Sequence, residues 1–243
     1  MEYDLLLKGP WLVIHHGGDS NNTGAIALLG GVFDPVHQGH VDIALSALHH
    51  PQISAVHWIP CARIPHHKSA PIAPAQARLE MVHIACSGTD GFVIDDIEYH
   101  REGPSYTADT VKSIATQSQG ETLLWIVGAD NARNLAKWKS AEELWNIAIP
   151  LVAPRPGVKP NSRGAPAPAE SSYLHREDFP YIDDSRWQLF CQWQLPPVSA
   201  QISSSQIRES LRNSKDFDKL SAEGLGIPSA VLDFIVAGGW YQS

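Results

Sequence analysis

Long hydrophobic runs are missing from this chain of 243 residues. The apolar patches at 5–7 and 11–14 are short and interrupted, whereas a bilayer-spanning helix needs roughly 18 consecutive apolar residues. The N-terminal segment carries Glu2 and Asp4 where a secretory signal would be basic. We therefore expect neither a membrane span nor a signal peptide.

Cysteine and positive charge are also scarce. The three cysteines, Cys61, Cys86 and Cys191, are far apart and form no C-x-x-C pair, which argues against a disulfide framework or a zinc knuckle and favours a reducing, cytoplasmic compartment. The net charge of −8 argues against binding nucleic acid or an anionic membrane through a broad basic face. Any phosphate chemistry must use a local group of cations and backbone amides.

Short apolar runs alternate with amphipathic stretches, a pattern typical of an α/β fold with a Rossmann-like, doubly wound parallel sheet. Strands are expected at 25–30, 55–59, 92–97, 122–127, 149–152 and 187–195. Helices are expected at 41–48, 74–86, 107–116, 205–212 and 229–237. A further helix should begin at Ser140, which forms an S-x-x-E capping box with Glu143.

The domain organisation predicted from these elements is simple. Residues 25–243 form a single domain with a small C-terminal helical portion, and residues 1–24 form an N-terminal extension of unassigned role. The stretch 154–172 is rich in Pro, Ala, Gly and Ser, so we expect an exposed loop there. No internal repeat is evident.

The most informative stretch is GGVFDPVHQGH at 30–40, where the first strand should pass into the first helix. Gly30 and Gly31 allow a ligand to approach the backbone, and Pro35 stiffens the turn. His37 and His40 are three residues apart, so both imidazoles can face one volume. That volume lies at a helix N-terminus, which favours anions, and the stretch therefore predicts a triphosphate site.

Other interpretations of the histidine pair are a metal site or two hydrogen-bonded side chains in a tight turn. Neither accounts for the double glycine and the F-D-P string. The stretch also differs from the dinucleotide-binding G-x-G-x-x-G and from the phosphate loop that ends in G-K-[ST].

The same stretch resembles the signature of the H-x-G-H nucleotidyltransferase superfamily, and within it that of bacterial nicotinate-nucleotide adenylyltransferases, GG-[ST]-FDP-x-H-x-GH. The resemblance covers roughly 25–241 and implies an enzyme that joins a mononucleotide to the AMP part of ATP. It implies that the nucleotide-binding residues of this turn are Gly30, Gly31, Val32, Phe33, His37 and His40. Val32 departs from the usual Ser or Thr.

A second phosphate site is predicted in ISSSQIR at 202–208. Ser203 and Gln206 fit a capping box, and Arg208 lies about one turn inside the resulting helix. The stretch resembles the family's ISST-x-IR, which implies that Ser203, Ser204, Ser205 and Arg208 hold the triphosphate from the far side of the crevice.

Further short motifs resemble the family's acceptor site. In IPHHK, His67 and Lys68 would bind phosphate, and His66 stands where the family has a proline. In PSYT, the segment Ser105, Tyr106 and Thr107 would hold the nicotinate carboxylate through backbone amides, which implies a preference for the acid over the amide.

The remaining motifs follow the fourth and fifth strands. Gly128 and Asp130 resemble the family's G-x-D, which contacts ribose, and Trp138 would stack on the pyridine ring. Arg155 in RPG would lie near the adenine.

The reaction implied by this resemblance transfers AMP from ATP to nicotinate mononucleotide, with His37, His40, Lys68 and Arg208 as the catalytic cations. Mg²⁺ would arrive bound to ATP without protein ligands, and Asp34 would brace the turn. The alternatives are another transferase of the superfamily, acting on pantetheine phosphate or transferring a cytidylyl group, and a non-catalytic nucleotide-binding regulator.

Overall fold

A computed structural model describes residues 24–65, 70–118, 120–132, 134–154, 174, 176–193, 195–196, 202–214 and 220–242. The predicted N-terminal extension therefore lies outside the described residues except for Gly24. The predicted exposed loop likewise lies outside them except for Pro154.

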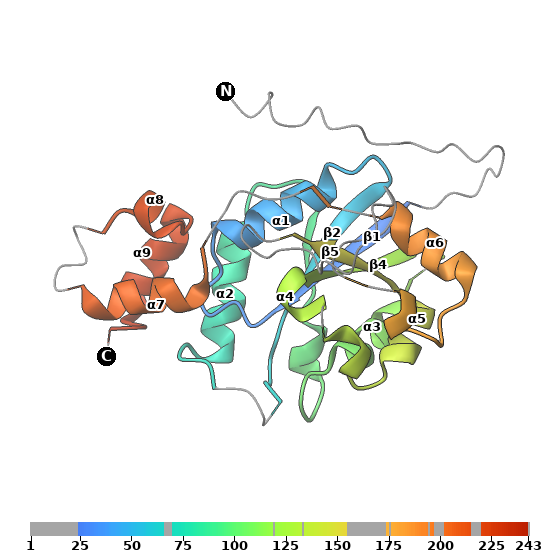
Figure 1. Cartoon of the computed structure of the whole chain (residues 1–243). Helices are drawn as coiled ribbons and strands as arrows, with labels where there is room; N and C mark the ends of the chain where they lie inside the picture. Colours follow the sequence, from blue (N-terminus) through green and yellow to red (C-terminus); the bar gives the residue numbers. More distant parts are fainter. Residues whose placement is uncertain are drawn as a thin grey trace.

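A parallel five-stranded sheet forms the centre of the molecule, in the order β3-β2-β1-β4-β5 (Figure 1). Its strands are β1 (Ala25–Gly31), β2 (Ile53–Pro60), β3 (Phe92–Ile94), β4 (Thr122–Gly128) and β5 (Ile149–Ala153). The chain proceeds outward from β1 to β3, returns across the sheet, and continues outward through β4 and β5. The strand order therefore reverses between β1 and β4, where ligands bind in doubly wound sheets.

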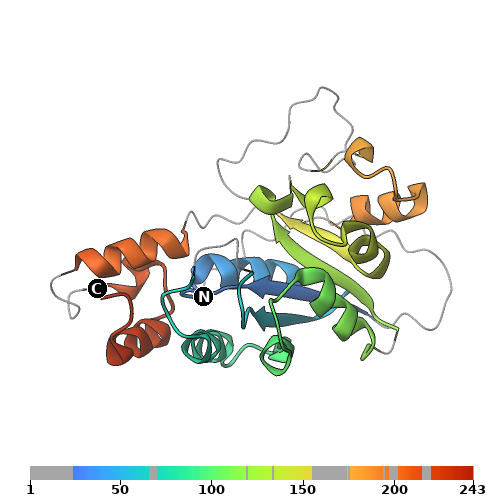
Figure 2. The same cartoon turned by 90° about the horizontal axis from the view of Figure 1, so that it is seen from below.

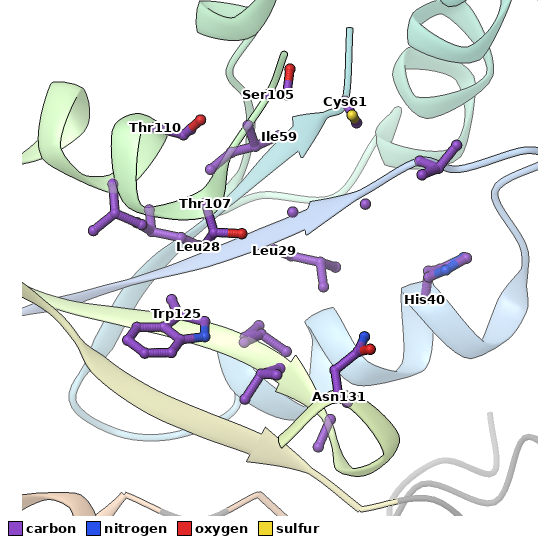
Figure 3. A pocket seen from close by; sticks show the side chains of 18 of the residues that line it. Leu28, Leu29, His40, Ile59, Cys61, Ser105, Thr107, Thr110, Trp125 and Asn131 are labelled. Atoms are coloured by element: carbon purple, nitrogen blue, oxygen red, sulfur yellow. The ribbon is translucent and has the colours of Figure 1, made fainter. Parts of the chain in front are cut away.

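Helices cover both faces of this sheet. They are α1 (Gln38–Leu48), α2 (Ala75–Cys86), α3 (Thr107–Ala115), α4 (Ala129–Ala132), α5 (Ala141–Ile147), α6 (Asp184–Gln192), α7 (Ser204–Asn213), α8 (Ala222–Leu225) and α9 (Ser229–Gly238). Short 3₁₀ turns are η1 (Ile97–His100), η2 (Leu135–Lys137) and η3 (Arg176–Asp178). Helices α1 and α3 lie on opposite sides of β1 (Figures 1 and 3), as right-handed crossovers require.

The core strands are buried on both faces. Ala27, Val56 and Leu124 have no exposed surface, which explains why these strands read as continuous apolar runs instead of alternating ones. The predicted α/β class, the parallel sheet and five of the six predicted strands are confirmed.

The C-terminal helices α7, α8 and α9 gather at one end of the molecule, where α9 packs against α2 (Figures 1 and 2). The predicted small helical portion is therefore confirmed, and it lies beside the N-terminus of α1: the Gln38 N–H donates to the Gly226 carbonyl at 2.8 Å.

The predicted strand at 187–195 is wrong, because this segment belongs largely to helix α6. Asp183 caps the helix by accepting a hydrogen bond from the Arg186 N–H at 2.7 Å. Trp187 and Phe190, three residues apart, then bury their rings against Trp145. The aromatic packing and the cap therefore stabilise a helix where a strand was predicted.

Two smaller predictions also need correction. The third strand ends at Ile94 and not at residue 97. The Asp95 carboxylate accepts a hydrogen bond from the N–H of Ile97, the first residue of η1. The capping box at Ser140 is absent: Ser140 has a φ of 57° and makes no side-chain cap bond. Glu143 instead accepts a hydrogen bond from Lys112 Nζ at 2.6 Å.

Within the described ranges, no helix combines the length and apolar character required to cross a membrane.

Candidate active site

A pocket of about 380 Å³ opens at the carboxyl ends of β1 and β4, at the point where the strand order reverses. Figure 3 shows its walls: His40 reaches in from α1, Thr107 and Thr110 come from the α3 side, and Asn131 follows β4. The predicted position of the ligand site therefore coincides with a cavity large enough for a nucleotide-sized ligand.

The double glycine forms the floor of this pocket at the end of β1. A Cβ added at Gly30 would meet nothing within 4 Å, whereas one added at Gly31 would lie 2.7 Å from the Phe33 ring. Gly30 thus leaves open space for a ligand, and Gly31 lets the buried Phe33 ring fold back beneath the turn. Phe33 itself has a φ of 50° and does not line the pocket.

The two histidines stack on one another at the N-terminus of α1. Their ring centroids are 3.8 Å apart, and the His37 N–H donates to His40 Nδ1 at 3.2 Å. Phe33 contacts the His40 ring edge-on, with centroids 5.0 Å apart. His40 lines the pocket, while His37 is only 3% exposed and stands behind it. The prediction that both imidazoles face one volume is therefore wrong for His37, whose ring packs against that of His40 and does not line the pocket.

Asp34 braces the turn, as predicted. Its carboxylate accepts hydrogen bonds from the N–H groups of Ile72 and Ala73 at 2.9 and 3.0 Å. It also accepts one from the Tyr241 hydroxyl at 2.7 Å. Burial, followed by the bond to Asp34, raises the pKa of Tyr241, which keeps the phenol protonated as a donor. Asp34 thus joins the turn to the segment before α2 and to the C-terminus.

The second predicted segment meets this turn directly. Arg208 Nη1 donates to the Asp34 carbonyl at 2.6 Å, and Ser204 Oγ donates to the Pro35 carbonyl at 2.9 Å. The capping box of Ser203 with Gln206 is confirmed at the start of α7. Two segments more than 160 residues apart therefore meet at the turn that follows β1.

Other parts of the pocket wall come from the PSYT segment and from the chain after β4. The Ser105 N–H donates to the Arg63 carbonyl at 2.8 Å. Lys139 Nζ lies 4.3 Å from the centre of the Tyr106 ring. Trp138 is half-buried and lines the pocket, which leaves part of its ring available to a ligand.

The predicted site residues fall into three groups. Those that line the pocket are Gly30, Gly31, Val32, His40, Ser105, Thr107, Gly128, Asp130 and Trp138. Those that are described but stand behind or beside it are Phe33, His37, Tyr106, Ser203, Ser204, Ser205 and Arg208. Those outside the described residues are His67, Lys68 and Arg155.

Arg78 on α2 is the main structural residue that the sequence analysis missed. It is 1% exposed, and Nη1 donates to the carbonyls of Val32 and Cys61 at 2.6 and 2.7 Å. Its Nε donates to the Ala73 carbonyl at 3.3 Å. One guanidinium thus fixes the chain after β1 against the chain after β2. The signal in the sequence that could have identified Arg78 is a charged residue among apolar ones on the same face of a predicted helix.

The described side chains offer few ligands for a metal ion. No group of three His, Cys, Asp or Glu side chains close enough to hold an ion occurs in the described ranges. The pocket is lined by one exposed carboxylate, Asp130, and one buried carboxylate, Glu98. A divalent ion here would therefore take most of its ligands from a bound polyphosphate and water.

Comparison with known proteins agrees with this geometry. The model of the "Cytidylyltransferase-like" family matches residues 28–210. A protein of Dechloromonas aromatica described as "Probable nicotinate-nucleotide adenylyltransferase" is 32% identical over 221 residues, covering 90% of this chain and 98% of that protein. A protein of Aeromonas salmonicida with the same description is 30% identical over 225 residues, covering 90% and 97%.

Among solved structures, the nicotinic acid mononucleotide adenylyltransferase of Plasmodium falciparum, complexed with NaAD, superposes with a TM-score of 0.64. The match covers 90% of this chain and 97% of that one, at 19% sequence identity. At this identity the likeness establishes the shared fold.

Proposed function

The chain belongs to the nicotinate-nucleotide adenylyltransferase family, and on that premise we propose that the pocket between β1 and β4 joins nicotinate mononucleotide to the AMP part of ATP. The products are nicotinate adenine dinucleotide and pyrophosphate. The observation that carries this assignment to the pocket is the convergence of the turn at 30–40 with α7, through Arg208 and Ser204.

The proposed reaction is an in-line displacement. A 5′-phosphate oxygen of the mononucleotide attacks the α-phosphorus of ATP, and the bond to the leaving pyrophosphate breaks. The attacking oxygen is already anionic near neutral pH, so the site needs no general base. It must hold two polyanions in line, and orientation of this kind can supply about 7–11 kcal/mol.

Each group has a proposed role. His40, at the pocket wall, stabilises the charge that develops on the phosphates, and His37 fixes its ring from behind. Arg208 would exchange its bond to the Asp34 carbonyl for a phosphate oxygen. Lys68 and His67, by resemblance, add charge from the loop after β2, and Arg155 approaches the adenine. Mg²⁺, carried by ATP, would neutralise part of the triphosphate charge.

The acceptor is proposed to lie at the other end of the pocket. Trp138 stacks on the pyridine ring, the backbone amides at 105–107 hold the nicotinate carboxylate, and Asp130 with Gly128 contacts ribose. The cytoplasmic location stays a prediction, supported by three cysteines that form no disulfide.

The test is an acceptor panel. Purified protein is mixed with ATP, Mg²⁺ and either nicotinate mononucleotide, its amide or phosphopantetheine, and pyrophosphate release is followed. We expect fastest release with nicotinate mononucleotide and a dinucleotide product of the expected mass. Faster turnover of phosphopantetheine, or no release with any acceptor, would refute the proposal.

A further inference from the structure

A buried carboxylate that neither the sequence analysis nor the proposed mechanism uses lines the pocket. Glu98 lies in η1 and is only 8% exposed. It shares the pocket wall with Thr110 and Val111 of α3 and with Trp125 of β4. The apolar surroundings make any charge there felt more strongly than at the surface.

The hydrogen bonds of Glu98 satisfy only one of its two oxygens. Oε1 accepts a hydrogen bond from Thr110 Oγ1 at 2.7 Å. Oε2 is buried and has no hydrogen-bond partner in the described part of the chain. Burying a carboxylate oxygen without a partner costs free energy, and a positive group on a ligand in the pocket would offset that cost.

Arg101 is connected to this carboxylate through Thr110, and its Nη1 is likewise buried with no hydrogen-bond partner in the described part of the chain. Its Nη2 donates to the same Thr110 hydroxyl at 3.1 Å, so Thr110 separates the two charges. Glu98 lines the pocket and Arg101 does not. Of these two charged groups, the carboxylate of Glu98 is therefore the one that faces the pocket.

The rest of the described pocket wall is poor in positive charge. It contains no lysine or arginine; its ionisable side chains besides Glu98 are His40, Asp130 and Cys61. His40 lies at the phosphate end. The indole of Trp138 lines the same pocket, and aromatic faces attract cations. A carboxylate and an indole that line one pocket suit a flat, positively charged ring.

Nicotinate mononucleotide carries such a ring, because its pyridine nitrogen is quaternary and permanently positive, whereas the adenine of ATP is neutral. Resting on the proposed function, we infer that Glu98 is a specificity-determining residue that recognises the positive charge of the pyridinium ring through space. It follows that the site distinguishes the oxidised mononucleotide from its dihydro form, whose ring has no charge.

The experiment compares oxidised and reduced nicotinate mononucleotide as acceptors, at saturating ATP, for wild type and for Glu98→Gln. Glutamine has nearly the same volume, and its carbonyl can still accept from Thr110. For wild type we expect kcat/KM to favour the oxidised form at least about tenfold. In Glu98→Gln this preference should shrink to about threefold or less, mainly through a higher KM for the oxidised form.

The matched control is Glu102→Gln, which removes the same charge from an exposed residue that does not line the pocket. Its preference should equal that of wild type. If Glu98→Gln lowers kcat/KM equally for both acceptors, or leaves the preference unchanged, the inference is overturned.

The affinity of the wild-type protein for each form of the nucleotide provides a second test that needs no variant. Calorimetry with each form should show tighter binding of the oxidised nucleotide, and equal affinities would overturn the inference. Failure of the proposed function looks different: wild type would then not turn over nicotinate mononucleotide at all, and the inference would fall with it.

Discussion

His40 is held in place by contacts that exist without any ligand. The His37 N–H, the stacked His37 ring and the edge of Phe33 all contact its imidazole. A group fixed in this way needs little reorganisation when charge develops on the phosphates. We expect His40→Ala to lower kcat by about 100-fold or more, measured by pyrophosphate release, with the cooperative thermal transition retained.

The control for this variant is His83→Ala, since His83 is an exposed histidine on α2. It should leave kcat unchanged. A His40→Ala protein with a near-normal rate would remove this imidazole from the catalytic machinery.

Trp138 follows the short turn η2 and lines the pocket, where we propose that the acceptor binds. Stacking of a base on an aromatic side chain contributes about 1–3 kcal/mol. We therefore expect Trp138→Ala to raise the KM for nicotinate mononucleotide about tenfold while the KM for ATP stays the same, as measured by steady-state kinetics.

Trp138→Phe keeps an aromatic face and should recover most of the loss. If both variants show the wild-type KM for the acceptor, the ring does not stack on the substrate. A change confined to the KM for ATP would place the adenine there instead.

At the level of single elements, β3 is short and its end depends on one carboxylate. Asp95 follows the strand, and its Oδ2 lies 3.7 Å from His57 Nδ1 on β2. The neighbouring imidazole, with help from the Ile97 N–H and against the effect of burial, lowers the pKa of Asp95. The ionised form is thus favoured in the folded state.

This shift predicts a pH-dependent contribution to stability. Because the folded-state pKa lies below the unfolded value of about 3.9, the stabilisation is fully present above that value and is lost as the pH falls through the folded-state pKa. We expect Asp95→Asn to lower the melting temperature at pH 6, with a difference from wild type that shrinks toward pH 3. Asp90→Asn, at an exposed position, should show no such trend.

The elements that the sequence predicts well are those whose burial is uniform. Apolar runs such as 123–127 are buried on both faces, so composition alone identifies them as strands. Helix α6 was missed because its stability comes from rings that pack on Trp145, 42 residues earlier in the chain. Contacts between distant residues leave no local pattern.

The candidate site also contains both kinds of feature: those that a short motif specifies and those that depend on contacts between distant residues. The glycines, the histidines and the α7 cap have local geometry that a short motif specifies, and the structure brings them together. Arg78 and Tyr241 act through carbonyl and carboxylate groups far away in sequence. Nothing in the residues around Tyr241 indicates that its hydroxyl bonds to Asp34, because the partner is 207 positions away.

At the scale of the whole molecule, the C-terminal helical portion supports the nucleotide-binding turn. Ser204 and Arg208 donate to its carbonyls, the Gly226 carbonyl accepts from Gln38, and Tyr241 donates to Asp34. These contacts come from α7, from the end of α8 and from the chain after α9. The C-terminal portion therefore contributes both a proposed phosphate ligand and the support that keeps the turn in position.

Tyr241→Phe tests this support with the smallest possible change, because it removes one hydroxyl and keeps the buried ring. Asp34 would retain its bonds to the amides of Ile72 and Ala73, so the protein should fold. We expect a loss of about 1 kcal/mol in the free energy of unfolding, measured by urea denaturation. We also expect a severalfold rise in the KM for ATP and an unchanged KM for the acceptor, since Asp34 belongs to the turn that we propose binds the phosphates.

The comparison is Tyr181→Phe. The Tyr181 hydroxyl is buried, but it makes no hydrogen bond within the described ranges, so its removal should leave both the stability and the KM for ATP near wild-type values. Equal behaviour of the two variants would mean that the Tyr241 hydroxyl does not hold the turn. A loss of stability without a change in the KM for ATP would limit Tyr241 to packing the C-terminal helices, and Asp34 would then position the phosphates without help from the C-terminus.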